Sequence, residues 1–114
     1  MANFNKVILM GNLTRDPELR YSNSGKAIGK IRIAVNREWK DKSGESKKET
    51  SFFDCTSFGK AAELISQYTE KGSPLLIDGR LKQESWETDQ GEKRSKIVVI
   101  IENFQFVGGR KSDQ

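Results

Sequence analysis

Apolar residues recur with a period of two over most of this chain, which predicts a mainly β protein. Runs rich in valine, isoleucine and phenylalanine alternate with turn signals such as Asp16-Pro17 and Lys42-Ser43-Gly44. The predicted strands lie near residues 4–13, 27–39, 50–58, 75–86 and 94–106. Helical spacing of apolar residues occurs only at 60–71, and Gly72 is placed to end that helix.

The order of these elements indicates the fold class. Three strands, a helix and two strands are typical of an all-β protein with one short helix, the five-stranded Greek-key barrel called the OB-fold. In that barrel a helix links strands three and four. At 114 residues the chain is long enough for one such domain and too short for two.

Alternate residues of a strand point to opposite faces, so the phase of each run separates core from surface. In the third run, Phe52 and Phe58 share a face with Asp54, and a ring beside a carboxylate is expected outside. In the fourth run, the expected core face would hold Leu75, Ile77 and Leu81, which leaves Trp86 outside as well.

In the second run, the alternation that places residues in the core continues over more residues than a small barrel can bury. Ile33 and Val35 are expected inside, yet the same phase would also bury Arg37 and Trp39. Either a β-bulge shifts the register, or the strand outruns the barrel as a projecting hairpin. We expect the projection, because the next ten residues are almost all polar.

Two runs, 7–10 and 97–101, are apolar on both faces, whereas a barrel buries only one face of each strand. Cover by the helix or by a loop would explain this pattern, and so would contact with a second copy. We favour the second copy, because one short helix cannot cover both strands, and we predict a homo-oligomer. The residues expected in its interface are Val7, Ile8, Leu9, Met10, Val98 and Ile100.

Composition excludes several kinds of chemistry. The chain has no histidine and one cysteine, Cys55, which rules out an internal disulfide, a classical zinc site and catalysis by a Ser-His-Asp or Cys-His group. We therefore expect no enzymatic activity, no cofactor and no metal. No signal region or membrane-spanning segment follows Met1, so we expect a cytoplasmic protein without membrane contacts. The net charge of +4 suits a polyanionic partner.

The predicted surface rings are interleaved with lysine and arginine, which favours a nucleic-acid ligand. One exposed ring is usually a packing residue, but four rings on three neighbouring strands are harder to explain in that way. A base stacked on an aromatic ring contributes roughly 1 to 3 kcal/mol, and cations follow the phosphates. Because a duplex hides its base faces, we predict a single strand. The expected binding residues are Trp39, Phe52, Phe58, Trp86, Arg37, Lys42, Lys48, Lys60, Lys82, Lys93 and Arg94.

Four segments carry a further signal: GNLTRDPELRY at residues 11–21, NREWKD around Trp39, FGKAAE at 58–63, and KGS followed by LIDGRL and Trp86. Together they resemble the bacterial single-stranded DNA-binding protein (SSB) family over residues 3–109, and the first segment is the most specific. The resemblance implies an OB-fold homotetramer that wraps single-stranded DNA in replication, recombination and repair, in association with the nucleoid. By position it assigns the base-stacking roles to Trp39, Phe52, Phe58 and Trp86.

The chain departs from the family pattern at some positions. Asp54, Glu84 and Ser85 stand near the rings where well-known relatives are basic. We therefore expect more of the phosphate contacts from the hairpin at 42–48 and from residues 93–96.

The family normally continues into a flexible linker and an acidic tail that recruits other proteins, whereas this chain stops at Gln114. We divide it into a DNA-binding domain at 1–109 and the start of a truncated or absent tail at 110–114. Replication and repair proteins are expected as partners only where that tail is present.

Two other functions compete with this prediction. An OB-type RNA-binding or primosome protein would also use rings and cations, but the segment at 11–21 favours the DNA binder. A metal-dependent nuclease would need several converging carboxylates. The candidate acids are instead spread over different loops and strands: Asp16, Asp54, Asp78 and Asp89.

Overall fold

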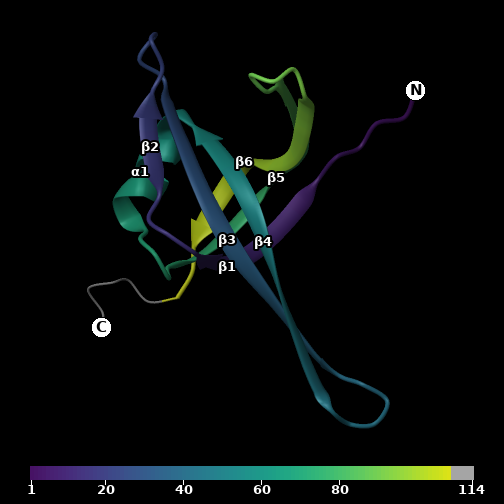
Figure 1. The fold of residues 1–114 in the computed structure, drawn as a ribbon. Coiled ribbons are helices and arrows are strands. Elements are labelled where there is room, and N and C mark those ends of the chain that lie inside the picture. Colours follow the sequence, from purple (N-terminus) through teal and green to yellow (C-terminus); the bar gives the residue numbers. More distant parts are fainter. Residues whose placement is uncertain (109–114) are drawn as a thin grey trace.

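The computed structural model describes residues 1–108, which form six strands and one helix (Figure 1). In chain order these elements are β1 (Val7–Leu13), β2 (Glu18–Tyr21), β3 (Ala27–Lys40), β4 (Ser46–Phe58), α1 (Gly59–Tyr68), β5 (Pro74–Glu87) and β6 (Lys93–Phe106). Residue 109, the last of the predicted domain, and the predicted tail at 110–114 lie outside the described residues.

Five strands close into a barrel, because β1 pairs with β5 along most of its length and meets β3 at its end. The strand order is β1-β5-β6-β4-β3, and β2 adds to the outer edge of β3. The pairings within residues 1–108 are antiparallel except for a short parallel contact, in which Cys55 of β4 faces Val99 of β6. The predicted OB-fold barrel is confirmed, with one strand more than the sequence predicts.

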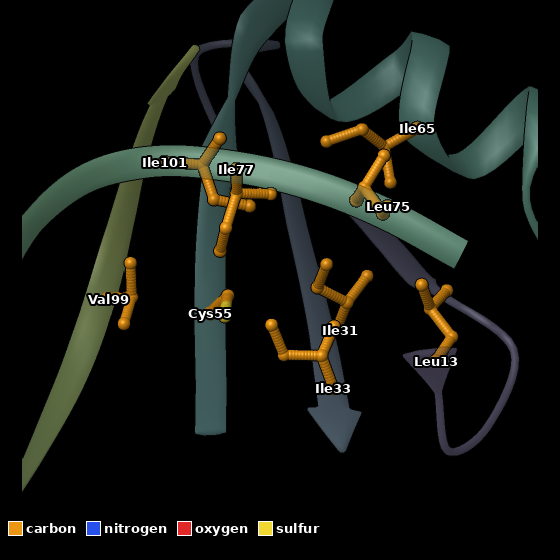
Figure 2. Packing of buried hydrophobic residues seen from close by; sticks show 9 residues of the cluster. All are labelled: Leu13, Ile31, Ile33, Cys55, Ile65, Leu75, Ile77, Val99 and Ile101. Atoms are coloured by element: carbon orange, nitrogen blue, oxygen red, sulfur yellow. The ribbon is translucent and has the colours of Figure 1, made fainter. Parts of the chain in front are cut away.

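Alternate residues of the barrel strands point inward and form the core (Figure 2). The buried cluster consists of Leu13, Ile31, Ile33, Cys55, Ile65, Leu75, Ile77, Val99 and Ile101. All but Ile65 come from strands, and Ile65 is supplied by α1. Burying one such large apolar side chain contributes about 1.5–3 kcal/mol, so the alternation of apolar residues is the main source of stability.

β3 and β4 continue beyond the barrel as a two-stranded ribbon, which projects from the body of the protein in Figure 1. Their register runs without a bulge from Ile28 opposite Phe58 to Lys40 opposite Ser46. The outer parts of both strands, residues 36–40 and 46–51, are exposed throughout. The projecting hairpin is therefore confirmed.

A β-bulge in β6 marks the place where the barrel ends. Ile101 and Asn103 pair with successive residues of β5, which leaves Glu102 as an extra residue. Beyond Gly79, β5 and β6 form a second hairpin that extends outward. Leu81 lies on this hairpin and is 44% exposed, so the prediction that it belongs to the core is wrong.

The helix ends earlier than predicted. Its last residue is Tyr68, and Thr69 terminates it in place of Gly72. The backbone N–H and the hydroxyl of Thr69 both donate to the carbonyl oxygen of Ile65, at 3.1 and 2.6 Å. These bonds satisfy the end of the helix in the way that a glycine turn otherwise would. No helix in residues 1–108 is both long and apolar enough to cross a membrane.

Gly79 lies at the bulge, where a Cβ atom would overlap the carbonyl oxygen of Ile100. Gly79→Ala should therefore lower the free energy of unfolding by about 1–3 kcal/mol, the usual cost of overpacking. Urea unfolding followed by circular dichroism measures this change. The control is Gly25→Asn, because Gly25 has a φ of +86° in open space and asparagine tolerates that region. Unchanged stability of Gly79→Ala would show that the strands separate there without cost.

Burial raises the pKa of the Cys55 thiol to about 12, and the adjacent Asp54 carboxylate adds to this shift. Near neutral pH the native protein should therefore resist a disulfide reagent that labels the unfolded chain quickly. Because the folded pKa exceeds the ordinary value, the folded state keeps its proton longer, and stability should fall as pH rises above about 9. Rapid labelling of the native chain would contradict this prediction.

Candidate nucleic-acid interface

The outer face of the sheet from β3 to β6 carries three of the four predicted rings. Phe52 lies opposite Ala34 in the ladder, and Phe58 follows in the same outward phase. Trp86 occupies the outward phase of β5, opposite Arg94 of β6. All three rings are more than one-third exposed. We call the outward surface around Phe52, Phe58 and Trp86 the ring face.

Trp39 lies on the other side of the β3–β4 ribbon. Because the ladder has no bulge, its phase is that of the core residues Ile31 and Ile33, and it sits opposite Lys47 on the projecting hairpin. Its side chain is 36% exposed. The structure thus gathers three predicted rings on one surface and places the fourth on the opposite side of the ribbon.

Each of the three predicted surface rings on β3 and β4 lies under a cation. The pairs, with the distance from the cation to the ring centroid, are Arg32 with Phe52 (4.7 Å), Lys26 with Phe58 (5.1 Å) and Arg37 with Trp39 (4.4 Å). An exposed contact of this kind contributes about 0.5–1 kcal/mol. The contact stabilises a large ring at a solvent-exposed position and keeps a positive charge beside it.

Asp54 lies on the ring face between β3 and β6, where it pairs with two cations. Its Oδ1 is 3.9 Å from Nε of Arg32, and its Oδ2 is 3.7 Å from Nζ of Lys96. These groups are roughly half exposed, so each pair alone is weak. Asp54 also lines a small pocket of about 70 Å³ together with Lys96 and two further cations, Arg15 and Lys30.

The predicted cations are exposed and are distributed over both hairpins and the helix. Arg37, Lys42 and Lys48 belong to the β3–β4 hairpin, Lys60 to the first turn of α1, and Lys82, Lys93 and Arg94 to the β5–β6 hairpin. Two of them have acidic partners in the same hairpin. Arg37 lies 3.7 Å from Glu49, and Arg94 lies 3.4 Å from Glu92.

Sequence reasoning missed three cations of the ring face: Lys26, Lys30 and Arg32. Arg32 and Lys30 share the outward phase of β3, opposite Asp54 and Thr56. Alternation along β3 alone could have placed them outside. Their position beside Phe52 and Phe58 follows only from the register between β3 and β4, which no local pattern specifies.

The exposed apolar residues of β1 form a second surface. Ile8 and Met10 are 65% and 56% exposed, and Met10 lies opposite Leu76 of β5. β1 meets β3 only at Asn12 and Leu13, so its edge from residue 7 to residue 11 has no strand neighbour among the described residues. This edge could accept a further strand.

The remaining residues predicted for an oligomer interface do not belong to this surface. Val7 and Leu9 point inward and pack against the core. Val98 and Ile100 are 3% and 5% exposed within the single chain, and Val98 lines the same small pocket as Asp54. The chain itself therefore covers Val98 and Ile100, which offer little surface to a second copy.

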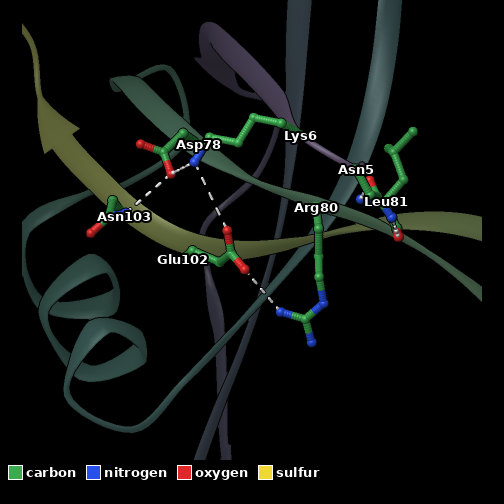
Figure 3. A network of polar contacts seen from close by, with 7 residues as sticks. All are labelled: Asn5, Lys6, Asp78, Arg80, Leu81, Glu102 and Asn103. Carbon is green, nitrogen blue, oxygen red and sulfur yellow. Dashed lines mark hydrogen bonds and ion pairs between the residues drawn. The ribbon is translucent and has the colours of Figure 1, made fainter. Parts of the chain in front are cut away.

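A polar network borders the apolar strip of β1 (Figure 3). Lys6 Nζ lies 3.1 Å from Asp78 Oδ1 and 4.0 Å from Glu102 Oε1, while Arg80 reaches the other oxygen of Glu102 at 3.2 Å. Asn103 donates a hydrogen bond to Asp78, and this bond, followed by that of Lys6, lowers the pKa of Asp78. The charges beside the strip are thus already paired within one chain.

Comparison with known proteins identifies relatives over nearly the whole chain. The model of the single-strand binding protein family matches residues 4–107. The single-stranded DNA-binding protein of Wolinella succinogenes is 50% identical over 97% of this chain and 68% of its own length. That of Helicobacter hepaticus is 46% identical over 96% of this chain and 64% of its own length. The chain therefore spans about two thirds of the length of these relatives.

Two solved structures have the same fold. The Plasmodium falciparum SSB in complex with ssDNA matches with a TM-score of 0.87 at 22% identity, over 95% of this chain and 98% of that one. A deletion mutant of the single-stranded DNA binding protein from Thermus aquaticus matches with a TM-score of 0.82 at 34% identity, over 94% of this chain and 52% of that one. The barrel, the outward rings and the match of the family model over residues 4–107 lead to one conclusion: this chain belongs to the single-strand binding protein family.

Proposed function

We propose that this chain binds single-stranded DNA with little regard to base sequence. The observation that carries the proposal is the ring face, where Phe52, Phe58 and Trp86 point outward among lysine and arginine side chains. Flat rings offer every base a stacking partner, and the cations follow the phosphates. A duplex buries its base faces in its own stack, so the same surface favours a single strand.

Binding to DNA is favoured over RNA binding and over catalysis. The relatives are named single-stranded DNA-binding proteins, and the family model describes binding proteins. These names give no support to the RNA-binding or primosome alternative. Within residues 1–108 no three His, Cys, Asp or Glu side chains are grouped to hold a metal ion, as a nuclease would need.

The cellular role that follows is the protection of unwound DNA. A protein that covers single strands would act in replication, recombination and repair, and it would lie in the cytoplasm at the nucleoid. Where the whole protein carries an acidic tail, that tail would recruit replication and repair proteins. The relatives are about one and a half times as long as this chain, which leaves room for such a segment.

The same chain is proposed to form a homotetramer. Support comes from Ile8 and Met10, which expose large apolar side chains on β1, and from the unpaired edge of that strand. A second copy that adds its own β1 to this edge would satisfy the free backbone groups and cover the apolar strip.

Rings and cations should affect DNA binding in different ways. Phe52→Ala or Trp86→Ala should weaken binding to oligo(dT) by about 1–3 kcal/mol, with little change in salt dependence, because stacking releases few ions. Lys42→Ala or Lys60→Ala should instead flatten the slope of log affinity against log salt by roughly 0.7 per lost phosphate contact. Fluorescence anisotropy of labelled oligo(dT) at several salt concentrations measures both effects.

The matched control for the ring variants is Tyr68→Ala, which removes an exposed ring of α1 that packs against Phe106. It should leave DNA affinity unchanged. Quenching of Trp39 and Trp86 emission by single strands, but little by duplex DNA, would support stacking. Ring variants that keep full affinity and only unfold at lower temperature would show that Phe52 and Trp86 are packing residues, and the proposal would fail.

Ile8→Lys should dissociate the oligomer, because it would bury a charge in an apolar contact without a partner. Light scattering at micromolar concentration should give about four times the chain mass of 12.9 kDa for the parent, and a smaller assembly for the variant. Ile97→Lys is the control, since Ile97 is similarly exposed on β6, outside the proposed interface. A parent protein that stays monomeric would contradict the assembly.

A further inference from the structure

The ring face contains a carboxylate in the place where a binding surface for DNA would be expected to be purely positive. Asp54 projects from β4 between Arg32 of β3 and Lys96 of β6, and its two oxygens lie 3.9 and 3.7 Å from their nitrogens. Each oxygen therefore faces one cation. The same side chain lines a pocket with two further cations, Arg15 and Lys30, and with a second carboxylate, that of Glu84. The Asp54 carboxylate thus lies between two cations, where a bound anion would otherwise sit.

We propose that Asp54 is an internal competitor of the DNA backbone: its carboxylate holds Arg32 and Lys96 in the free protein, and a phosphate group replaces it when a strand binds. The inference rests on the proposed function and names Asp54 as a residue that lowers the affinity of the ring face for single-stranded DNA. A phosphate offers oxygen acceptors of the same kind as a carboxylate, so both cations can exchange one partner for the other. The exchange leaves Asp54 in water, where it is 43% exposed already.

The exchange is coupled to base stacking through Arg32. Its guanidinium carbon lies 4.7 Å from the centroid of Phe52, so the cation covers one face of the ring in the free protein. Movement of Arg32 toward a phosphate uncovers that face. The positive charge and the stacking surface therefore become available to the strand in the same step.

Trp39, on the opposite side of the ribbon, has a similar arrangement of an arginine and a carboxylate. Arg37 lies 4.4 Å from the centroid of Trp39 and 3.7 Å from Glu49, its direct partner across the ladder. Glu49 holds one cation, whereas Asp54 holds two. The ribbon thus repeats a unit of ring, arginine and carboxylate, and Asp54 is the member with the largest expected effect.

The test is the affinity of Asp54→Asn for oligo(dT) at about 50 and 200 mM salt. Asparagine has the same shape but no charge, so Arg32 and Lys96 are released without loss of packing. Affinity should rise about two- to five-fold at the lower salt, the range that corresponds to one exposed ion pair, and the gain should shrink at the higher salt. The control is Glu63→Gln, which removes one negative charge from α1 and keeps a hydrogen-bond acceptor for Tyr21. It should leave affinity unchanged.

A second background separates exchange from simple repulsion between Asp54 and the strand. A chain that carries Arg32→Gln and Lys96→Gln lacks both cations with which Asp54 forms ion pairs, so Asp54→Asn should bring no gain there. A gain that persists there would mean that Asp54 repels the DNA directly, and it would overturn the exchange. Thermal unfolding of every variant checks that the fold is retained.

The failure of this inference is distinguishable from that of the proposed function. If the unmodified chain binds oligo(dT) but Asp54→Asn binds it no more tightly, only the exchange is wrong. If the unmodified chain binds no single strand at either salt concentration, both are wrong.

Discussion

The uninterrupted ladder between β3 and β4 is the constraint on which the rest of the structure depends. Its register fixes the phase of both strands from the barrel to the tip of the hairpin. On one side, within the barrel, the side chains form the core with Ile31, Ile33 and Cys55. On the other side the same two strands carry Phe52, Phe58 and the cations beside them. A shift by one residue would exchange these two sets, so burial of the core also positions the ring face.

Much of this arrangement is predictable from the sequence, because the signals are local. The period of two identifies five of the six strands, and the phase of Phe52, Phe58 and Trp86 places them outside. The polar residues after Trp39 indicate the projecting hairpin, since a run without apolar residues has nothing to bury. These predictions depend only on which side chains of a strand face water, and that pattern can be read from each strand separately.

The rest depends on contacts between strands, which no local pattern encodes. β2 is four residues long, too short for a clear period, and is defined by its pairing with β3. The extra residue at Glu102 reflects how β6 fits against β5, and Val98 and Ile100 look like interface residues until the fold covers them. Arg32 belongs to the ring face only because of its position across the ladder from Asp54.

β5 explains how one chain can hold two surfaces with opposite demands. Its outward residues run from Leu76, beside β1, to Trp86 on the outer hairpin, a distance of about 33 Å along an extended strand. In the proposed assembly the surface at β1 would gain free energy by excluding water, whereas the ring face has to remain open to a charged, hydrated strand. The polar network of Asp78, Arg80 and Glu102 lies between them and is closed within the chain. In the proposed assembly, a second copy seated on Ile8 and Met10 would therefore need no contact with the rings, and a DNA strand on the rings would need none with the second copy.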